Sequence, residues 1–157
     1  MHMKSKYLIP TIIFSLAGTL FFLGGCGSGH DHYSPIGVVL SIDGNMIAAQ
    51  ESSVVTYATG DAIYVPAGAS TGTITVQFMD DDGSLFIPER SGYELRHTVG
   101  NSDVISVTHP AADGPWSLIL QGNQPGSTTI QFDLWHGGHS DFSSVAFQVE
   151  VEEPDSD

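Results

Sequence analysis

The stretch GSTTIQFDLWHGGHSDFSSVAFQVEV, residues 126 to 151, contains two runs in which apolar and polar side chains alternate. In the first run the apolar positions are Ile130, Phe132 and Leu134, and in the second they are Val145, Phe147, Val149 and Val151. A period of two is typical of a strand that buries one face. The stretch therefore predicts two antiparallel strands joined by a short loop, and this loop holds His136 and His139.

Short β-prone segments bounded by turn residues fill most of the remaining chain. They lie at residues 36–42, 46–49, 54–57, 62–65, 73–79, 93–99, 104–108 and 116–120. After residue 25 we find no segment of about ten residues or more with helical periodicity. Strands spaced by about 8 to 12 residues, with turns between them, favour an antiparallel β-sandwich. Asp43-Gly44-Asn45 joins the first two segments, so residues 36–59 predict an extra hairpin at the edge of the sandwich.

The first 25 residues have the pattern of a secretory signal peptide. Two lysines precede an apolar run at residues 7–23, and small residues follow it. The alternative is an uncleaved transmembrane anchor. The run has only 17 residues and contains a proline and a glycine, which places it at the lower limit for spanning a bilayer of about 30 Å. Both interpretations predict an exported protein that is tethered to a membrane.

The box Leu23-Gly24-Gly25-Cys26 resembles the lipobox of bacterial lipoproteins. The resemblance implies that Cys26 becomes the first residue of the mature chain and carries lipid, palmitate included. It also implies attachment to a membrane of the bacterial cell envelope, facing the periplasm or the cell surface. Gly27 in place of aspartate favours the outer membrane under the enterobacterial sorting rule. Residues 26–35 then form the lipidated cysteine and a small, polar, flexible tether.

Charge and cysteine content exclude several classes of protein. Cys26 is the only cysteine, so no intramolecular disulfide can form, and the 132 residues left after cleavage must rely on a hydrophobic core. They contain two arginines against 18 acidic residues, a net formal charge of −16. Phosphate backbones repel so acidic a chain, which argues against nucleic acid as a partner. The chain also lacks a Gly-x-Ser-x-Gly elbow and a glycine-rich phosphate loop, so we expect no enzyme.

Residues 60–151 resemble the bacterial immunoglobulin-like domains of the Big2 type. Three segments carry the resemblance: NSDVISV at 101–107, PGSTTI at 125–130 and the closing FQVEV at 147–151. It implies an all-β, antiparallel Ig-like β-sandwich that serves binding or spacing at cell surfaces. We expect a single domain over residues 36–153, followed by an acidic tail at 154–157. His97 stands where family members usually place a core tryptophan.

The loop from His136 to Phe142 is where we expect chemistry. Its pattern H-x-x-H-x-D-F is similar to the end of small uncharacterised bacterial lipoproteins, which implies no activity. Two neutral imidazoles can bind Zn²⁺, Cu²⁺ or Ni²⁺, and Asp141 adds an oxygen ligand or a hydrogen-bond acceptor. Two ligands do not make a tight site, so further ligands are needed; the candidates are His30 and His32, with His97 and His109 also available. In the alternative, His136 caps the core, His139 is a polar loop residue, and the tether histidines belong to a spacer.

Three other features have competing interpretations. His97 shares an apolar strand face with Leu95, which favours a hydrogen-bonded core residue over a ligand. The run Asp80-Asp81-Asp82-Gly83 suits Ca²⁺ in residue type but lacks the alternation of an EF-hand loop, so an acidic turn is preferred. Trp135 occupies an outward-facing position of the alternating strand pattern. It either packs under residues 140–144 or belongs to a recognition surface.

The sequence therefore predicts a membrane-anchored, non-enzymatic binding lipoprotein that holds a divalent transition metal in its His-x-x-His loop. The alternative is a structural or interaction module that docks onto an envelope protein or a glycan, without metal.

Overall fold

The computed structural model describes residues 32–153, and this part of the chain is built from strands and turns without a helix. The predicted signal peptide, Cys26, His30 and the acidic tail at 154–157 lie outside the described residues. Residues 32–153 therefore include no helix long and apolar enough to cross a bilayer. The fold class agrees with the sequence prediction of an all-β chain.

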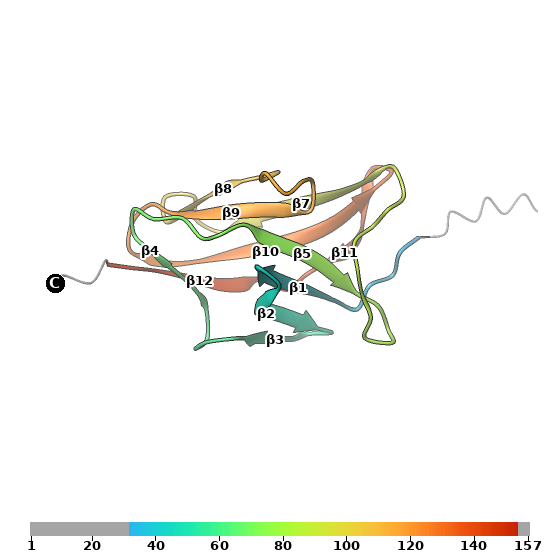
Figure 1. Ribbon diagram of the computed structural model, residues 1–157, viewed down its shortest axis with the longest axis horizontal. Coiled ribbons are helices and arrows are strands. Elements are labelled where there is room, and N and C mark those ends of the chain that lie inside the picture. Colours follow the sequence, from blue (N-terminus) through green and yellow to red (C-terminus); the bar gives the residue numbers. More distant parts are fainter. Residues whose placement is uncertain (1–31, 154–157) are drawn as a thin grey trace, which may run out of the picture. The chain divides into compact units, whose positions relative to one another are not determined.

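Twelve strands form two sheets that pack around one core (Figure 1). The larger sheet has the order β3-β2-β1-β5-β9-β8, with β6 pairing β5. Its strands are β1 (Gly37–Ile42), β2 (Asn45–Glu51), β3 (Val54–Tyr57), β5 (Ile74–Met79), β6 (Leu85–Phe86), β8 (Ile105–Thr108) and β9 (Ser117–Gly122). The smaller sheet has the order β11-β10-β12-β4, with β7 pairing β10. Its strands are β4 (Ile63–Pro66), β7 (Tyr93–Val99), β10 (Gly126–His136), β11 (His139–Ser143) and β12 (Phe147–Glu152).

The pairing order is that of an immunoglobulin-like sandwich. The neighbours β1-β5-β9-β8 follow the A-B-E-D order of one immunoglobulin sheet, and β7-β10-β12 follow the C-F-G order of the other. Every pairing is antiparallel except that of β4 with β12, which is parallel. Because β1 pairs with both β2 and β5, the first hairpin is continuous with the larger sheet.

The core lies where the inward faces of the two sheets meet. β10 contributes the predicted triplet Ile130, Phe132 and Leu134, which are 0%, 1% and 0% exposed. The larger sheet contributes fully buried residues, among them Leu40, Phe78 and Leu118. The apolar positions of the alternating pattern in β10 thus face the core, and the polar positions between them face outward.

Two boundaries differ from the sequence prediction. We expected a loop between two strands of the 126–151 stretch, but residues 139–143 form a strand of their own, β11, which pairs with the end of β10. We also expected a flexible tether through Pro35, whereas Tyr33 packs against the core and Pro35 is buried. Both differences bring side chains to the same end of the sandwich.

Candidate metal centre

A two-residue turn folds β11 back onto β10. Gly137 and Gly138 have φ angles of 56° and 96°, and a tight hairpin turn requires positive φ at both central positions. The turn places His136 directly opposite His139 in the strand register. The sequence prediction that the two glycines bring the histidines alongside each other is consistent with this geometry.

A β-bulge in β11 directs Asp141 into the site. Phe142 lies opposite Leu134 and Ser140 lies opposite Trp135, so Asp141 is the extra residue without a partner on β10. Bulges commonly redirect a side chain in this way beside functional sites. The Asp141 side chain is only 4% exposed, although it stands on a strand at the rim of the sandwich.

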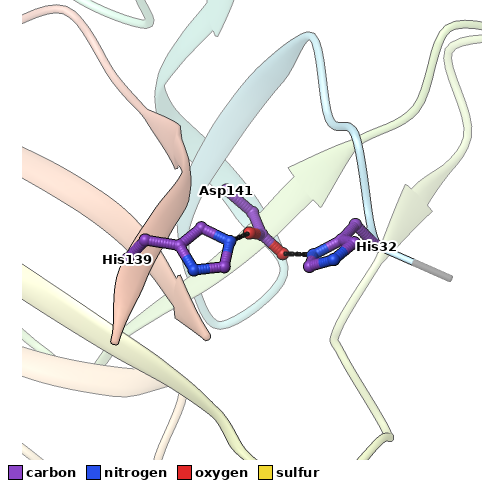
Figure 2. A group of neighbouring side chains, drawn as sticks. All are labelled: His32, His139 and Asp141. Atoms are coloured by element: carbon purple, nitrogen blue, oxygen red, sulfur yellow. Dashed lines mark hydrogen bonds and ion pairs between the residues drawn. The ribbon is translucent and has the colours of Figure 1, made fainter. Parts of the chain in front are cut away.

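Asp141 lies between two imidazoles, as Figure 2 shows. Nδ1 of His32 is 3.0 Å from Oδ2 of Asp141, and Nε2 of His139 is 2.8 Å from Oδ1. The two histidines come from opposite parts of the described chain, since His32 and Asp141 are 109 residues apart. The donor atoms of the three residues all lie within 4.8 Å of one another, and they form the one potential metal-binding group of this kind in residues 32–153.

His136 forms the inner wall of the site. It lies opposite Tyr93 in the register, and the two rings stack with centroids 4.1 Å apart at 10°. A Cβ at Gly92 would come within 3.5 Å of Cδ2 of His136, so that edge of the ring faces Gly92. The other edge points to Asp141, with Nδ1 3.8 Å from Oδ2. This Nδ1 is buried and has no hydrogen-bond partner.

Tyr93 links the site to the chain segment before β1. Its hydroxyl accepts a hydrogen bond from the backbone N–H of Tyr33 at 3.3 Å. The same hydroxyl also helps to lower the pKa of Asp141. Sequence reasoning placed Tyr93 on its strand but gave it no role at the site. The sequence did carry one signal: Tyr93 alternates in phase with Leu95 and so points inward at the start of β7. In the sheet register this position lies opposite His136, at the end of β10.

The histidines and Tyr93 stabilise the ionised form of Asp141. Burial alone raises the pKa of this carboxyl, but three effects outweigh it: the hydrogen bond and charge of His32, the hydrogen bond of Tyr93, and the charge of His139. The net result is a pKa below the usual value for aspartate. A buried carboxylate that stays charged is an effective ligand for a cation.

The remaining histidines of the described chain lie apart from this group. His97 is half-buried and its ring meets that of His109 edge-on at a centroid distance of 5.5 Å. Burial, and secondarily the nearby His109, lowers the pKa of His97. Neither residue joins the donor group around Asp141. Of the further ligands considered from the sequence, the structure therefore brings His32 to this group but not His97 or His109.

The acidic run at residues 80–83 is a turn. The Asp80 carbonyl accepts a hydrogen bond from Gly83 N–H, and the Asp82 carboxylate accepts two from Ser84, one from the backbone and one from the hydroxyl. These bonds to Ser84 lower the pKa of Asp82. Within the described residues, this run is not part of the group of potential metal ligands around Asp141.

Trp135 is half-buried beneath a cation. The Arg96 guanidinium carbon lies 3.9 Å from the centroid of the indole ring, and its Nη2 is 3.2 Å from the Glu94 carboxylate. The indole thus packs under Arg96 of the neighbouring strand β7, an arrangement that neither sequence interpretation specified.

Comparisons with known proteins assign neither a family nor a function to this chain. No family model matches the chain, and no curated protein matches it. Assignment to the Big2 type therefore stays a prediction. Among solved structures, domains 4 and 5 of the S-layer protein SbsC are similar, with 16% identity and a TM-score of 0.41. The match covers 74% of this chain and 65% of that one, and a likeness at this level carries no function across.

Proposed function

We propose that this chain is an exported, non-enzymatic lipoprotein of the bacterial cell envelope that binds a divalent transition metal through His32, His139 and Asp141. The observation that carries the proposal is the buried carboxylate with an imidazole nitrogen at hydrogen-bond distance from each oxygen. The lipobox at Cys26 supports the membrane attachment. The strongly negative net charge of the chain supports the choice of a cation as the ligand, since it attracts positive charge.

His136 supports metal binding over a purely structural cluster. Its Nδ1 is 3.8 Å from Oδ2 of Asp141, which is too long for a hydrogen bond. Two ligands on one Zn²⁺, each at about 2.0 to 2.1 Å, lie about 3.3 Å apart. Leaving a buried nitrogen unpaired costs about 1 to 3 kcal/mol, and a metal between the two atoms would remove that cost. His136 would then be the fourth ligand.

The ligand set selects a class of metal. Imidazole nitrogens with a single carboxylate suit Zn²⁺, Cu²⁺ and Ni²⁺. Ca²⁺ takes six to eight oxygen ligands, so three histidines and one aspartate do not suit it. Four side-chain ligands give the tetrahedral coordination number of a structural zinc site, although such sites are built mainly from cysteine.

Calorimetric titration of the full chain in detergent with each of the three metals tests the proposal. We expect one equivalent to bind with a dissociation constant near or below the micromolar range, and binding to weaken as imidazoles protonate below about pH 6.5. His139→Ala should weaken binding, whereas His109→Ala, which removes an imidazole outside the site, should not. No binding by the wild type, or equal binding by His139→Ala and the wild type, would rule the proposal out.

An interaction module is the second candidate, and one surface feature favours it. A pocket of about 560 Å³ lies where β1 ends, lined by mainly apolar residues that include Ile42, Ile47, Ala62, Ile63 and Tyr64. Apolar surface hollows mark binding sites more often than flat polar surface does. This candidate predicts that cross-linking in cells captures an envelope protein or a glycan on this face, and that Asp141→Asn leaves the cross-link unchanged.

A further inference from the structure

His32 belongs to a segment that is attached to the sandwich differently from the strands. Backbone pairing with the larger sheet begins at Ile36, whose N–H donates to the Met79 carbonyl at 2.8 Å. Residues 32–35 lie outside any strand. We call residues 32–35 the leading segment. Figure 1 shows it, in blue, approaching β1 from the side of the molecule where β11 lies.

Side chains hold the leading segment in place. The Tyr33 ring stacks on Phe86 with centroids 4.9 Å apart and meets Tyr93 edge-on at the same distance. Its N–H donates to the Tyr93 hydroxyl. His32 contributes its contact with Asp141, and its side chain remains 39% exposed. Few of these contacts are buried backbone bonds, so local opening of the segment does not require the sheets to separate.

A metal at the proposed site would bond this segment directly to the β10–β11 hairpin. His32 is the one proposed ligand on the leading segment, whereas His139 and Asp141 stand on the hairpin together with His136, the proposed fourth ligand. The open form keeps the hairpin ligands but loses His32, so it binds metal more weakly than the docked form. Where metal binding by the open form is negligible, metal favours the docked form by the factor 1 + [metal]/Kd. At a metal concentration of 100 times Kd, that factor is at most about 100.

We propose that metal binding fastens the leading segment to the β10–β11 hairpin and thereby sets how far the sandwich can stand from the membrane. This inference rests on the proposed function. Cys26 precedes His32 by six residues and Ile36 by ten. An extended chain spans at most about 3.3 to 3.6 Å per residue, so the reach from the lipid is about 20 Å when the segment is docked and about 35 Å when it is open.

Hydrogen exchange of the full chain in detergent micelles, with and without Zn²⁺, tests the proposal. We expect saturating Zn²⁺ to slow exchange of the Tyr33 and Ser34 amides by up to about 100-fold at 100 times Kd. The β11 amides should slow as well, while those of β8, which lies away from the site, should not change. His109→Gln is the matched control and should retain the full response.

A second variant shows whether the effect passes through His32. Glutamine keeps an N–H donor for Asp141 but is a poor ligand for Zn²⁺, and the three hairpin ligands remain. In His32→Gln at saturating Zn²⁺, we expect protection of β11 without protection of Tyr33 and Ser34. If Tyr33 and Ser34 are still protected in this variant, the fastening does not depend on His32 and the inference is wrong.

The remaining outcomes separate this inference from the proposed function. Slower exchange in β11 of the wild type, with Tyr33 and Ser34 unchanged, would overturn the fastening and leave the metal site standing. No change in either region, together with no calorimetric binding, would overturn both.

Discussion

Two groups of histidines in this sandwich have the same ring spacing and different surroundings. The rings of His32 and His139 are 5.5 Å apart, and so are those of His97 and His109. Between the first two lies the Asp141 carboxylate, at hydrogen-bond distance from both. The second two meet edge-on, and burial together with the neighbouring imidazole lowers the pKa of His97. Proximity of imidazoles alone therefore does not define a cation site.

The difference originates in the backbone. The bulge in β11 leaves Asp141 without a partner on β10 and directs its carboxylate between the histidines. His97 lies on β7 in continuous register with Phe132 of β10, and no bulge brings an acid to it. The two groups therefore differ in the position of a single buried carboxylate and not in the number of their histidines.

The largest effect should come from removing that carboxylate's charge. Asp141→Asn preserves the shape of the side chain but loses the negative charge and replaces one acceptor oxygen by an NH₂ donor. We therefore expect Zn²⁺ affinity to fall by about 100-fold or more, the upper range for loss of a supporting group. Calorimetry with Asp133→Asn as control checks this, because Asp133 is also on the hairpin but faces away from the histidines, bonding Ser140 and Ser143. Equal losses in both variants would mean that hairpin charge in general, not Asp141, drives binding.

Phenylalanine substitutions compare the two histidine groups directly. His136→Phe keeps a ring to stack on Tyr93 but removes the buried Nδ1, so we expect about tenfold weaker Zn²⁺ binding if that nitrogen is the fourth ligand. His97→Phe should leave the affinity unchanged. Thermal melts of both variants without metal establish that each is folded before titration. Unchanged affinity in His136→Phe would limit the ligand set to His32, His139 and Asp141.

The sequence predicted the parts of the fold that local pattern determines. Ile130, Phe132 and Leu134 are buried as their alternation indicates, and Asp43 and Gly44 form the turn between β1 and β2 while Asn45 begins β2. The pattern did not predict β11, because HSDFS lacks apolar alternation. This segment becomes a strand because a Gly-Gly turn folds it onto β10.

The candidate site could be predicted in part. His136, His139 and Asp141 are close in sequence, so a short loop was enough to suggest them. His32 was one of several candidates, since its contact with Asp141 spans 109 residues and depends on Tyr33 packing against Phe86 and Tyr93. No local period encodes such a contact. Burial of Asp141 was equally unpredictable, because it follows from a bulge that the sequence does not mark.

A substitution in the turn between β10 and β11 should moderately lower Zn²⁺ affinity at the group that contains His32 and His139. It should not affect His97 and His109. Gly137 has a φ of 56°, and a β-branched residue there costs about 1 to 2 kcal/mol. We expect Gly137→Val to lower both thermal stability and Zn²⁺ affinity, the latter by about fivefold to tenfold, since the histidines lose their register. Gly44→Val is the matched control, because Gly44 has a φ of 77° in the β1–β2 turn and a Cβ there also meets nothing. It should lose similar stability without a change in affinity.

The smallest effect should be a pH dependence of the melting temperature that comes from His97, in the group of His97 and His109. Because the pKa of His97 is lower in the folded state than in the unfolded state, the unfolded chain binds the proton more readily. His97 contributes fully to the stability of the fold above its unfolded-state pKa of about 6.5. This contribution is lost as the pH falls from about 6.5 through the lower pKa of the folded state. We expect the melting temperature of the wild type, relative to His97→Gln, to fall between pH 7.5 and pH 5 in metal-free buffer. A difference that stays constant over this range would mean that His97 and its contact with His109 do not couple folding to protonation.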